Sequence, residues 1–387
     1  MARISSAEAR RSLAAQVKRT AREAGFDLVG ITTADDFVDA ERVTIDRINK
    51  GLMGGLPWFH KDRVKRGCRP SDLLPGARSV IALGLSYRSD GPSITDNEVL
   101  RGRVSRYAWG RDYHRQMGQR AKTLVERLEA LGQSKGRFYV DYGPLPDRAI
   151  AQRAGLGWYG KNTNILTSEA GSWVFLAEIL TDLDLEPDEP LKKSCGSCTA
   201  CIPACPTNAI PAPYTIDNTL CISYHTIENR GSIPSELRPR FGNWIFGCDI
   251  CQDVCPVNEH NAAIEGDEAF ATTEVDRAYP NLITLLTLTK EEFDVRYRGT
   301  PLMRAKHEGM QRNACVALGN IGHSAAIQAL RKVLLDGSPI VREHAAWALG
   351  RIGGAKSEEA LIVAYQSEED EAVQAELQTA LAQLARP

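Results

Sequence analysis

The stretch CGSCTACIPACP, residues 195–206, places four cysteines within eleven positions and ends on a proline. A second run, Cys248-x2-Cys251-x3-Cys255-Pro256, lies further along the chain, and Cys221 stands alone between the two. The spacing C-x2-C-x2-C-x3-C-P is that of bacterial ferredoxins with two [4Fe–4S] clusters. A structural zinc site instead pairs two C-x2-C knuckles, so the spacing predicts iron–sulfur chemistry.

The same spacing predicts which cysteines share a cluster. Three closely spaced thiolates reach three corners of one cube, whereas the cysteine before the proline binds the other cluster. By this crossover the first set is Cys195, Cys198, Cys201 and Cys255. The second set is Cys205, Cys221, Cys248 and Cys251, with Cys221 in place of the missing first cysteine of the second run. Cys68 and Cys315 belong to neither set.

Composition limits the class of protein. The chain has 387 residues, of which 43% are hydrophobic and 25% charged, as expected of two or three globular domains. No apolar run approaches the ~20 residues of a membrane helix, and the N-terminus lacks the apolar stretch of a signal peptide. We therefore expect a cytoplasmic protein without membrane contact, in which clustered cysteines bind metal. The net charge of −2 gives no overall attraction to nucleic acid, although a local basic patch is compatible with it.

Helix and strand patterns alternate over residues 1–182 and predict an α/β domain. Strands are expected at 26–32, 79–87, 137–144 and 171–181, and helices at 112–132 and 147–155. The predicted domains are a cofactor-binding α/β domain, a ferredoxin-like domain, a connector and a helical repeat domain; their ranges are 1–182, 183–262, 263–300 and 301–387.

The C-terminal region contains an internal repeat. QRNACVALGNIG (311–322), VREHAAWALGRIG (341–353) and VQAELQTALAQLA (373–385) superpose with steps of 31 and 32 residues. Helix pairs at this period stack into a short solenoid of the HEAT-like kind. Cys315 aligns with Ala346 of the next repeat, so it is expected to be an inert core residue.

Two motifs fail a closer test. GLGWYG (155–160) spells G-x-G-x-x-G, but a helical stretch precedes it, whereas a dinucleotide fingerprint needs a strand there. Its glycines are interpreted instead as a place where the backbone approaches a large ligand. DYHRQMG (112–118) nearly matches the D-x-H-x-x-G of corrinoid modules, but Met117 replaces the glycine. His114 is therefore interpreted as a helix-start residue and not as a cobalt ligand.

Several stretches from the N-terminus to about residue 255 resemble the epoxyqueuosine reductase family, among them AREAGFDLVGIT, LLPGARSVIALGLSY, RYAWGRDYH, VDYGPLPDRAIAQRAGLGWYGKNTNIL and CISYHTIE. The resemblance implies a nitroreductase-like α/β fold that binds cobalamin base-off, with no protein histidine beneath the cobalt. It also implies reduction of epoxyqueuosine to queuosine in a tRNA anticodon loop, the last step of queuosine synthesis. Electrons would pass through the two clusters to cobalamin.

The resemblance further implies that Asp141 is the proton donor. Desolvation against the cofactor is expected to raise the pKa of this carboxyl; the alternative is a turn-capping aspartate. Further cobalamin contacts are expected among residues whose motifs match the family: Arg63, Tyr107, Asp141, Lys161, Asn162, Thr163, Ser172 and Ser223.

Candidate RNA contacts are basic residues, because phosphates are bound by lysine and arginine. They are residues 60–66, Arg101, Arg103, His225, Arg230, Arg238, Arg240, Arg312 and Arg342. We expect a monomer that takes electrons from an external donor. Two alternatives stay open: a cobalamin-dependent reductase of a small molecule, such as a dehalogenase, and a non-catalytic electron carrier that docks through its repeats.

Overall fold

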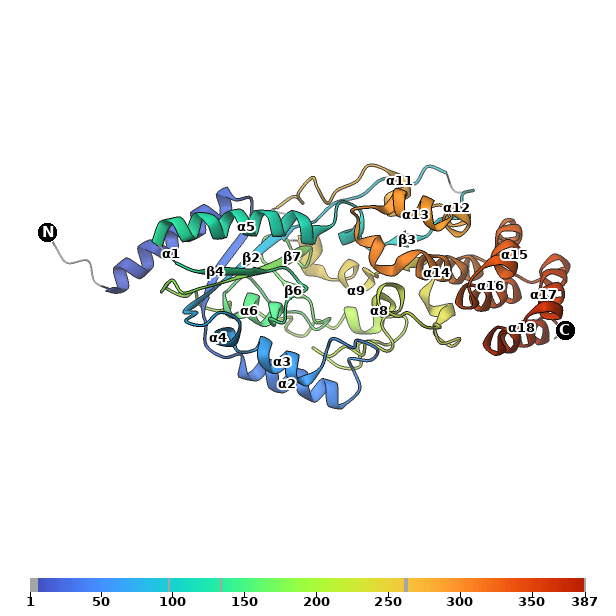
Figure 1. The fold of residues 1–387 in the computed structure, drawn as a ribbon, viewed down its shortest axis with the longest axis horizontal. Coiled ribbons are helices and arrows are strands. Elements are labelled where there is room, and N and C mark those ends of the chain that lie inside the picture. Colours follow the sequence, from blue (N-terminus) through green and yellow to red (C-terminus); the bar gives the residue numbers. More distant parts are fainter. Residues whose placement is uncertain (1–5, 97, 133, 261–263, 386–387) are drawn as a thin grey trace.

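The computed structural model describes residues 6–96, 98–132, 134–260 and 264–385. The molecule is elongated, with a sheet domain at the N-terminal end, helical repeats at the C-terminal end and the cysteine-rich region between them (Figure 1). Among the described residues, no helix is long and apolar enough to cross a membrane.

The sheet has four antiparallel strands in the order β1-β2-β7-β4. All eight residues of β2 are buried, which is the pattern of a strand covered on both faces. The predicted strands and the α/β fold class are therefore confirmed. The strands are β1 (Leu28–Thr33), β2 (Ser79–Ser86), β4 (Gly136–Tyr139) and β7 (Val174–Thr181).

Helices pack on both faces of this sheet (Figure 1). Alternate residues of β2 face opposite cores: Ile81 and Leu83 lie in the core with α1 and α5, whereas Val80 and Ala82 lie in the core with α3 and α6. The layers explain why these helices carry one apolar face each. The helices are α1 (Ser6–Glu23), α2 (Val38–Asn49), α3 (Lys61–Gly67), α4 (Pro70–Leu73), α5 (Tyr113–Gly132) and α6 (Asp147–Arg153).

The cysteine-rich region consists of loops and very short helices, as expected of a segment organised around inorganic clusters. A parallel pair of strands, β3 (Arg103–Val104) and β8 (Trp244–Phe246), ties it to the segment that leads into α5. Its helices are α7 (Cys201–Ala204), α8 (Ile222–Ile227), α9 (Ile250–Asp253) and α10 (Pro256–His260), and it contains the 3-10 turn η2 (Arg238–Phe241). The 3-10 turn η1 (Arg106–Ala108) lies between β3 and α5.

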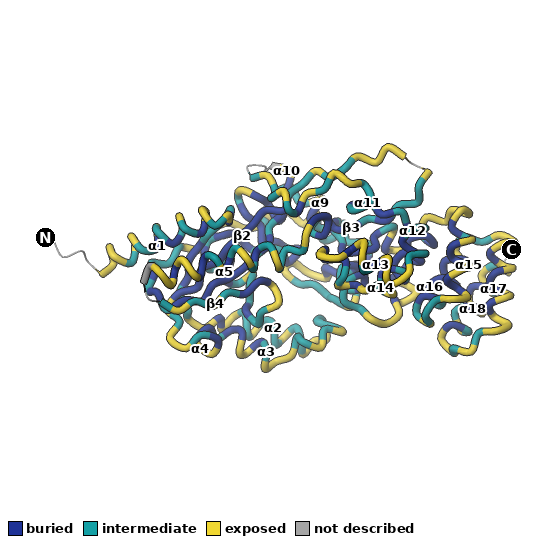
Figure 2. Tube along the Cα trace, turned by 45° about the horizontal axis from the view of Figure 1, so that its top comes forward, coloured by how far each residue is buried: buried dark blue, intermediate teal, exposed yellow. Residues whose placement is uncertain are grey.

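The repeats form the solenoid that the sequence predicts. The equivalent residues Ala317, Ala348 and Ala380 are at most 1% exposed, on three helices whose inner sides form a continuous buried face (Figure 2). A Cβ at Gly319 would lie 2.6 Å from the Trp347 ring, so this glycine allows close helix contact. The helices are α14 (Lys306–Ile321), α15 (Ile327–Asp336), α16 (Pro339–Ile352), α17 (Ala355–Ser367) and α18 (Glu371–Leu384).

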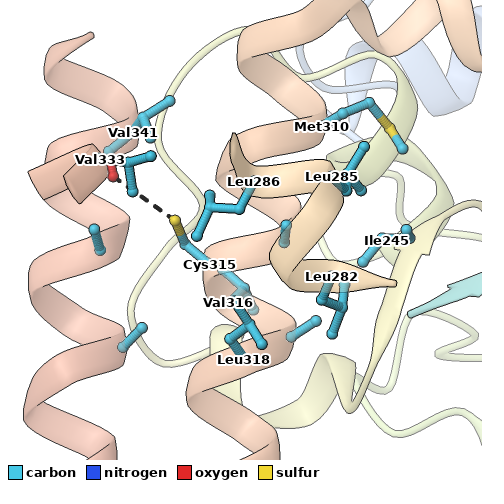
Figure 3. Close-up of a cluster of buried hydrophobic side chains, with 14 of the residues drawn as sticks. Ile245, Leu282, Leu285, Leu286, Met310, Cys315, Val316, Leu318, Val333 and Val341 are labelled. Atoms are coloured by element: carbon cyan, nitrogen blue, oxygen red, sulfur yellow. Dashed lines mark hydrogen bonds between the residues drawn. The ribbon is translucent and has the colours of Figure 1, made fainter. Parts of the chain in front are cut away.

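One hydrophobic core runs from the cysteine-rich region into the repeats. Ile245 of β8 and Leu282 of the connector pack with Val316 and Leu318 of α14 (Figure 3). Cys315 is fully buried there, which confirms its interpretation as a core residue. The connector helices are α11 (Val275–Ala278), α12 (Leu282–Thr287) and α13 (Lys290–Tyr297). The 3-10 turn η3 (Pro301–Ala305) leads into α14, and η4 (Ser324–Ala326) lies between α14 and α15.

The G-x-G-x-x-G stretch follows helix α6 and enters a small hairpin, β5 (Trp158–Tyr159) with β6 (Ile165–Leu166). The prediction that it is no dinucleotide fingerprint is confirmed. The interpretation of its glycines as facing a large ligand is wrong for the first two. A Cβ at Gly155 would lie 2.6 Å from the Glu189 carbonyl oxygen, and one at Gly157 only 2.3 Å from that of Leu166. These glycines let the chain approach its own backbone.

Candidate active site and iron–sulfur centre

Asp141 lies at a tight turn directly after strand β4. Its backbone φ is 56°, in the left-handed region that residues other than glycine rarely occupy, and the Tyr142 amide donates to the Val140 carbonyl across it. Arg63 holds this turn from outside, because its Nη2 donates to the carbonyl oxygens of Tyr142 and Gly143 at 3.0 and 2.7 Å. Unfavourable backbone held in place by its surroundings is typical of functional sites. Here it fixes where the Asp141 carboxyl points.

The start of helix α5 contacts this carboxyl. The Tyr113 hydroxyl donates to Asp141 Oδ2, and His114 Nε2 lies 3.5 Å from the same oxygen. The other ring nitrogen of His114 lies 2.8 Å from Asp112 Oδ1. The Asp141 side chain is nevertheless 59% exposed, so it remains within reach of a ligand. Two segments distant in sequence therefore build one acid–histidine–acid arrangement.

The charges of this arrangement differ from the sequence-based expectation. Burial raises the pKa of Asp141, but hydrogen bonds from His114 and Tyr113 and the charges of His114 and Arg148 outweigh it. The net direction is downward, so the expected rise of the Asp141 pKa is wrong. Burial lowers the pKa of His114. The two aspartates, Asp112 and Asp141, outweigh burial through their hydrogen bonds and their negative charges, and they raise this pKa to about 9. At neutral pH the proton of the pair resides on His114.

The placement of His114 at the first turn of α5 bears out its interpretation as a helix-start residue. Its contact with Asp141 is a role that the sequence alone did not reveal. The sequence feature that could have indicated this role is the DYH stretch (112–114), which places three polar groups at the start of an otherwise amphipathic helix.

A wall of aromatic side chains borders the carboxyl and reaches toward the cysteines. The Tyr113 ring stacks on Phe175 with centroids 4.3 Å apart, and Tyr107 lies 6.2 Å from Tyr113. On its other side Tyr107 lies 6.0 Å from Phe246, two residues before Cys248. Tyr107 thus lies between Tyr113, which bonds Asp141, and the strand that leads to Cys248.

The first predicted cysteine set comes together in the structure. Cys195, Cys198, Cys201 and Cys255 line one small cavity, although they come from two separate runs of sequence. Burial, followed by the charges of Cys195, Cys255 and Cys198, raises the pKa of Cys201. Four thiols around one cavity fit the donor set of a single [4Fe–4S] cube.

The second set shows the same mutual proximity. Burial raises the pKa of Cys221, and the Cys205 thiol adds to this rise. Hydrogen bonds to the Cys221 sulfur offset part of the rise. Burial also raises the pKa of Cys251, and the next contributions come from Cys221 and Asp249, followed by Cys201 and Cys205. Cys251 therefore lies beside its own set and also near the first set, as two adjacent clusters require.

Backbone amides point at several of these sulfurs. The Ala209 amide donates to Cys205 Sγ at 3.3 Å, and amides of Ser223 and Tyr224 bond Cys221. Such hydrogen bonds stabilise cluster-bound thiolates and tune cluster potentials. Among the described residues, no three His, Cys, Asp or Glu side chains converge on a single-ion site. Thiolates of a cube are spaced more widely, since each binds a different iron.

The predicted cobalamin contacts lie around the boundary between the sheet domain and the cysteine-rich region. Lys161 Nζ donates to the Gly196 carbonyl at 2.8 Å, and Asn162 Nδ2 to that of Cys251 at 3.1 Å. Ser172 is 4% exposed and bonds Asn258 and Gln252. Thr163 is buried with a φ of 69°. The half-buried members of the set are Arg63, Tyr107, Lys161 and Ser223.

The residues at this boundary fit a large flat redox group. Asp141 is exposed and borders the aromatic rings, and Tyr107 contacts both Tyr113, which bonds Asp141, and Phe246, which precedes Cys248 by two residues. A group lying against Tyr107 would face the proton on one side and the clusters on the other. As cobalamin contacts, the individual residues remain predictions.

Several predicted RNA contacts are wrong because they are buried. Arg238 and Arg312 are 2% and 1% exposed, and His225 is 4% exposed. Arg238 pairs with Glu343 and with Glu376 (2.9 Å), while Arg312 donates to backbone carbonyls of the cysteine-rich region. These side chains join the repeats to that region instead of facing a partner.

Other RNA candidates are engaged but partly accessible. Arg342 makes a two-pronged pair with Glu368, and Arg101 pairs with Asp276 at 2.7 Å. Arg230 donates to backbone carbonyls, and Arg103 covers the Trp244 ring. Candidates with exposed side chains include Arg240 and, within 60–66, Lys61, Lys65 and Arg66.

Comparison with known proteins is consistent with this arrangement. Residues 68–142 match the family described as epoxyqueuosine reductase QueG. A protein of Xanthomonas campestris pv. campestris named epoxyqueuosine reductase is 41% identical over 345 residues, covering 88% of this chain and 96% of that protein. The Escherichia coli K12 protein of the same name is 40% identical, covering 88% and 89%. The chain belongs to the epoxyqueuosine reductase family.

Other parts of the chain match two further families. Residues 194–258 match a 4Fe-4S double cluster binding domain and residues 300–382 match HEAT repeats. Both the expected two-cluster region and the repeats are thereby confirmed.

Solved structures of this family share the whole fold. A crystal structure of epoxyqueuosine reductase with an epoxyqueuosine-modified tRNA-Tyr stem loop superposes with a TM-score of 0.91 at 33% identity, covering 97% of this chain and 99% of that one. A Bacillus subtilis epoxyqueuosine reductase, with its aspartate-bearing catalytic loop swung out of the active site, superposes with a TM-score of 0.89 at 33% identity, covering 96% and 99%.

Proposed function

We propose that this enzyme reduces epoxyqueuosine to queuosine within the anticodon loop of tRNA, using two [4Fe–4S] clusters, base-off cobalamin and Asp141 as the proton donor. The supporting observation is the Asp141 turn, whose carboxyl contacts Tyr113 and His114 at one end of an aromatic row that leads to the second cysteine set. The relatives that carry this name, and the relative bound to a modified tRNA stem loop, support the choice of substrate.

Each cofactor is assigned to a different group of residues in this proposal. The two cysteine sets would hold the clusters, and residues along the boundary, Tyr107 above all, would hold cobalamin. When bound, these cofactors would supply low-potential electrons for breaking the carbon–oxygen bonds, and an external one-electron donor would refill them. His114 is not among the residues that would hold cobalamin, because it is already paired with two carboxylates.

The protein residues handle the proton. His114 holds it at Nε2 beside Asp141 at neutral pH, and the developing oxyanion of an opened epoxide is a strong base that draws it off. Asp141, 59% exposed, is the member of the pair that a substrate can reach. We infer that it receives the proton from His114 and delivers it to the substrate oxygen. The Tyr113 hydroxyl keeps the carboxyl oriented.

The Asp141 turn is also the part of the site that is able to move. In the Bacillus subtilis relative a catalytic loop named for an aspartate is swung out of the active site. We infer that residues 140–144 are its counterpart here. The Arg63 bonds to the Tyr142 and Gly143 carbonyls then hold the turn in its inward position.

The test is turnover by anaerobically reconstituted protein on a stem loop that carries epoxyqueuosine. Asp141→Asn keeps the size of the side chain but carries no acidic proton. We expect turnover to fall by about 10²–10⁴-fold, the usual weight of a positioned general acid, with cluster and cobalamin content intact. Near-normal turnover would mean that another acid or water supplies the proton. Absence of turnover by the wild type with full cofactor content would overturn the proposed substrate.

A further inference from the structure

Two further carboxyl groups lie together behind the Asp141 turn. Asp147 is the first residue of α6, Glu178 lies within β7, and their side chains are in hydrogen-bonding contact. Glu178 is 1% exposed. Glu178 Oε2 and Asp147 Oδ1 are both buried, and neither has a hydrogen-bond donor among the described residues. Ionised carboxylates only accept hydrogen bonds, so this contact requires a proton on one of the two groups.

The surroundings give the pair no neutralising partner. Among the described residues no ion pair includes either carboxyl; Arg148, the next residue of α6, acts on Asp147 only through its charge. In the sheet, Glu178 lies opposite Ala82 of β2 and Tyr139 of β4, and Tyr159 of β5 is the titratable neighbour of Asp147. Outside the pair, the acidic charge that acts on both carboxyls is that of Asp141, two residues beyond Tyr139.

These surroundings keep the pair protonated at neutral pH. Burial, followed by the charge of Asp141, raises the pKa of Asp147 to about 8. Burial, followed by the charge of Asp147 and the bond to it, raises the pKa of Glu178 well above its ordinary value. The two carboxyls titrate as one unit, because each senses the other.

The proposed reaction needs more than one proton. Removing the oxygen of an epoxide to leave an alkene takes two electrons and two protons, both carbon–oxygen bonds break, and the oxygen departs as water. His114 and Asp141 together hold one proton at neutral pH. A site covered by a bound cofactor and an RNA loop has limited access to bulk water for the second.

We propose that Asp147 and Glu178 form a proton-sharing carboxyl pair that supplies the second proton of the reaction through Asp141. This inference rests on the proposed function. The first proton comes from His114, and Asp141 passes it to the substrate oxygen. The pair then protonates the emptied Asp141, which completes the water molecule. The pair is left with one additional negative charge until solvent returns a proton, and the electrons come from the external one-electron donor.

The first test detects the stored proton without turnover. A protonated carboxylic acid gives a carbonyl stretch in infrared spectra that a carboxylate lacks. Reconstituted wild-type protein should show this band at pH 7, shifted in deuterated buffer and weakened as the pH rises through about 8, where Asp147 ionises. The band should be diminished in Glu178→Gln and in Asp147→Asn, and unchanged in Glu126→Gln, which alters an exposed carboxyl of α5. A wild-type spectrum without such a band would overturn the proposal.

The second test measures whether the proton travels through Asp141. Glu178→Gln should slow single turnover by about 10–10²-fold, near the lower range for a group that moves a proton. In an Asp141→Asn background the same change should have no further effect, since it removes a step that is already lost. If Glu178→Gln instead slows both backgrounds by the same factor, the pair has only a structural role. If the wild type itself fails to reduce the stem loop, the proposed function fails, whereas the infrared band still reports on the pair.

Discussion

Replacing His114 by glutamine should produce a loss of stability that depends on pH in a defined direction. Glutamine retains a polar side chain that is able to bond Asp112 or Asp141, but it carries no charge. In the structure His114 lies 2.8 Å from Asp112 and 3.5 Å from Asp141. The variant therefore removes the charge of the arrangement and keeps much of its shape.

The size of the effect follows from the pKa of His114. It rises from 6.5 to about 9, a difference of roughly 2.5, which at 1.36 kcal/mol for each pKa step gives an upper bound of about 3.4 kcal/mol. The His114 side chain is 37% exposed, so solvent screening reduces the expected contribution to about 1–2 kcal/mol.

The sign follows from linkage. A raised pKa in the folded state stabilises the protein fully below the unfolded value of 6.5, and this contribution disappears as the pH rises through about 9. The lowered pKa values of Asp112 and Asp141 act at the other end, where stability is lost as the pH falls below the usual aspartate range. The free energy of unfolding of the wild type minus that of His114→Gln should thus be largest near pH 6 and close to zero above about pH 10.

The assay is urea unfolding of both proteins under anaerobic conditions at pH 6, 7.5 and 10, followed by tryptophan fluorescence. Lys122→Gln is the control, because it removes one positive charge from the exposed face of the same helix. Its effect should be small and similar at all three values. A loss in His114→Gln that is independent of pH, or that grows with rising pH, would refute the assignment of the proton to this histidine.

Two further changes test the cluster assignment and the joint between domains. Cys221→Ser should lower bound iron from roughly eight to roughly four atoms in iron and sulfide analysis, because only the second set loses a ligand, and Cys198→Ser should remove the first cluster instead. Loss of both clusters from either variant would contradict the partition. Arg238→Met leaves Glu343 buried without its partner and should lower the free energy of unfolding by about 3–5 kcal/mol in urea titrations. The exposed Arg240→Met should change it by less than about 0.5 kcal/mol, and equal effects of the two would refute the buried joint.

Features that depend on local spacing were predictable from the sequence. The cysteine runs, the strand around Ser79–Ser86 and the helical repeats all express a short period, and the structure contains each of them. The crossover of Cys255 to the first set was also predictable, since it follows from how a proline-terminated run folds around two cubes.

Features that depend on contacts between distant segments were not predictable in the same way. Charge alone makes Arg238 and Arg312 resemble RNA contacts, yet each faces the joint between the repeats and the cysteine-rich region. For Asp141, the resemblance led us to expect desolvation against the cofactor but not the approach of His114 from the start of α5, and that approach reverses the direction of its pKa shift. A pKa is decided by which charges lie nearby, and the chain brings these together across many residues.

The pair formed by Asp147 and Glu178 was predictable from the sequence only in part. The strand WVFLAEIL is apolar apart from Glu178, and its neighbours in the sheet are buried on both faces. An ionised carboxylate in such a strand would be costly, so the glutamate must be neutral, paired with a cation or within a proton-sharing pair. The sequence thus indicates that Glu178 has an unusual partner. Only the fold shows that the partner is another acid, Asp147, and that the charge of Asp141 acts on both. Asp147 cannot stabilise a negative charge on Glu178, so the pair retains a proton instead. That is why this pair supports an inference about proton supply and not merely about stability.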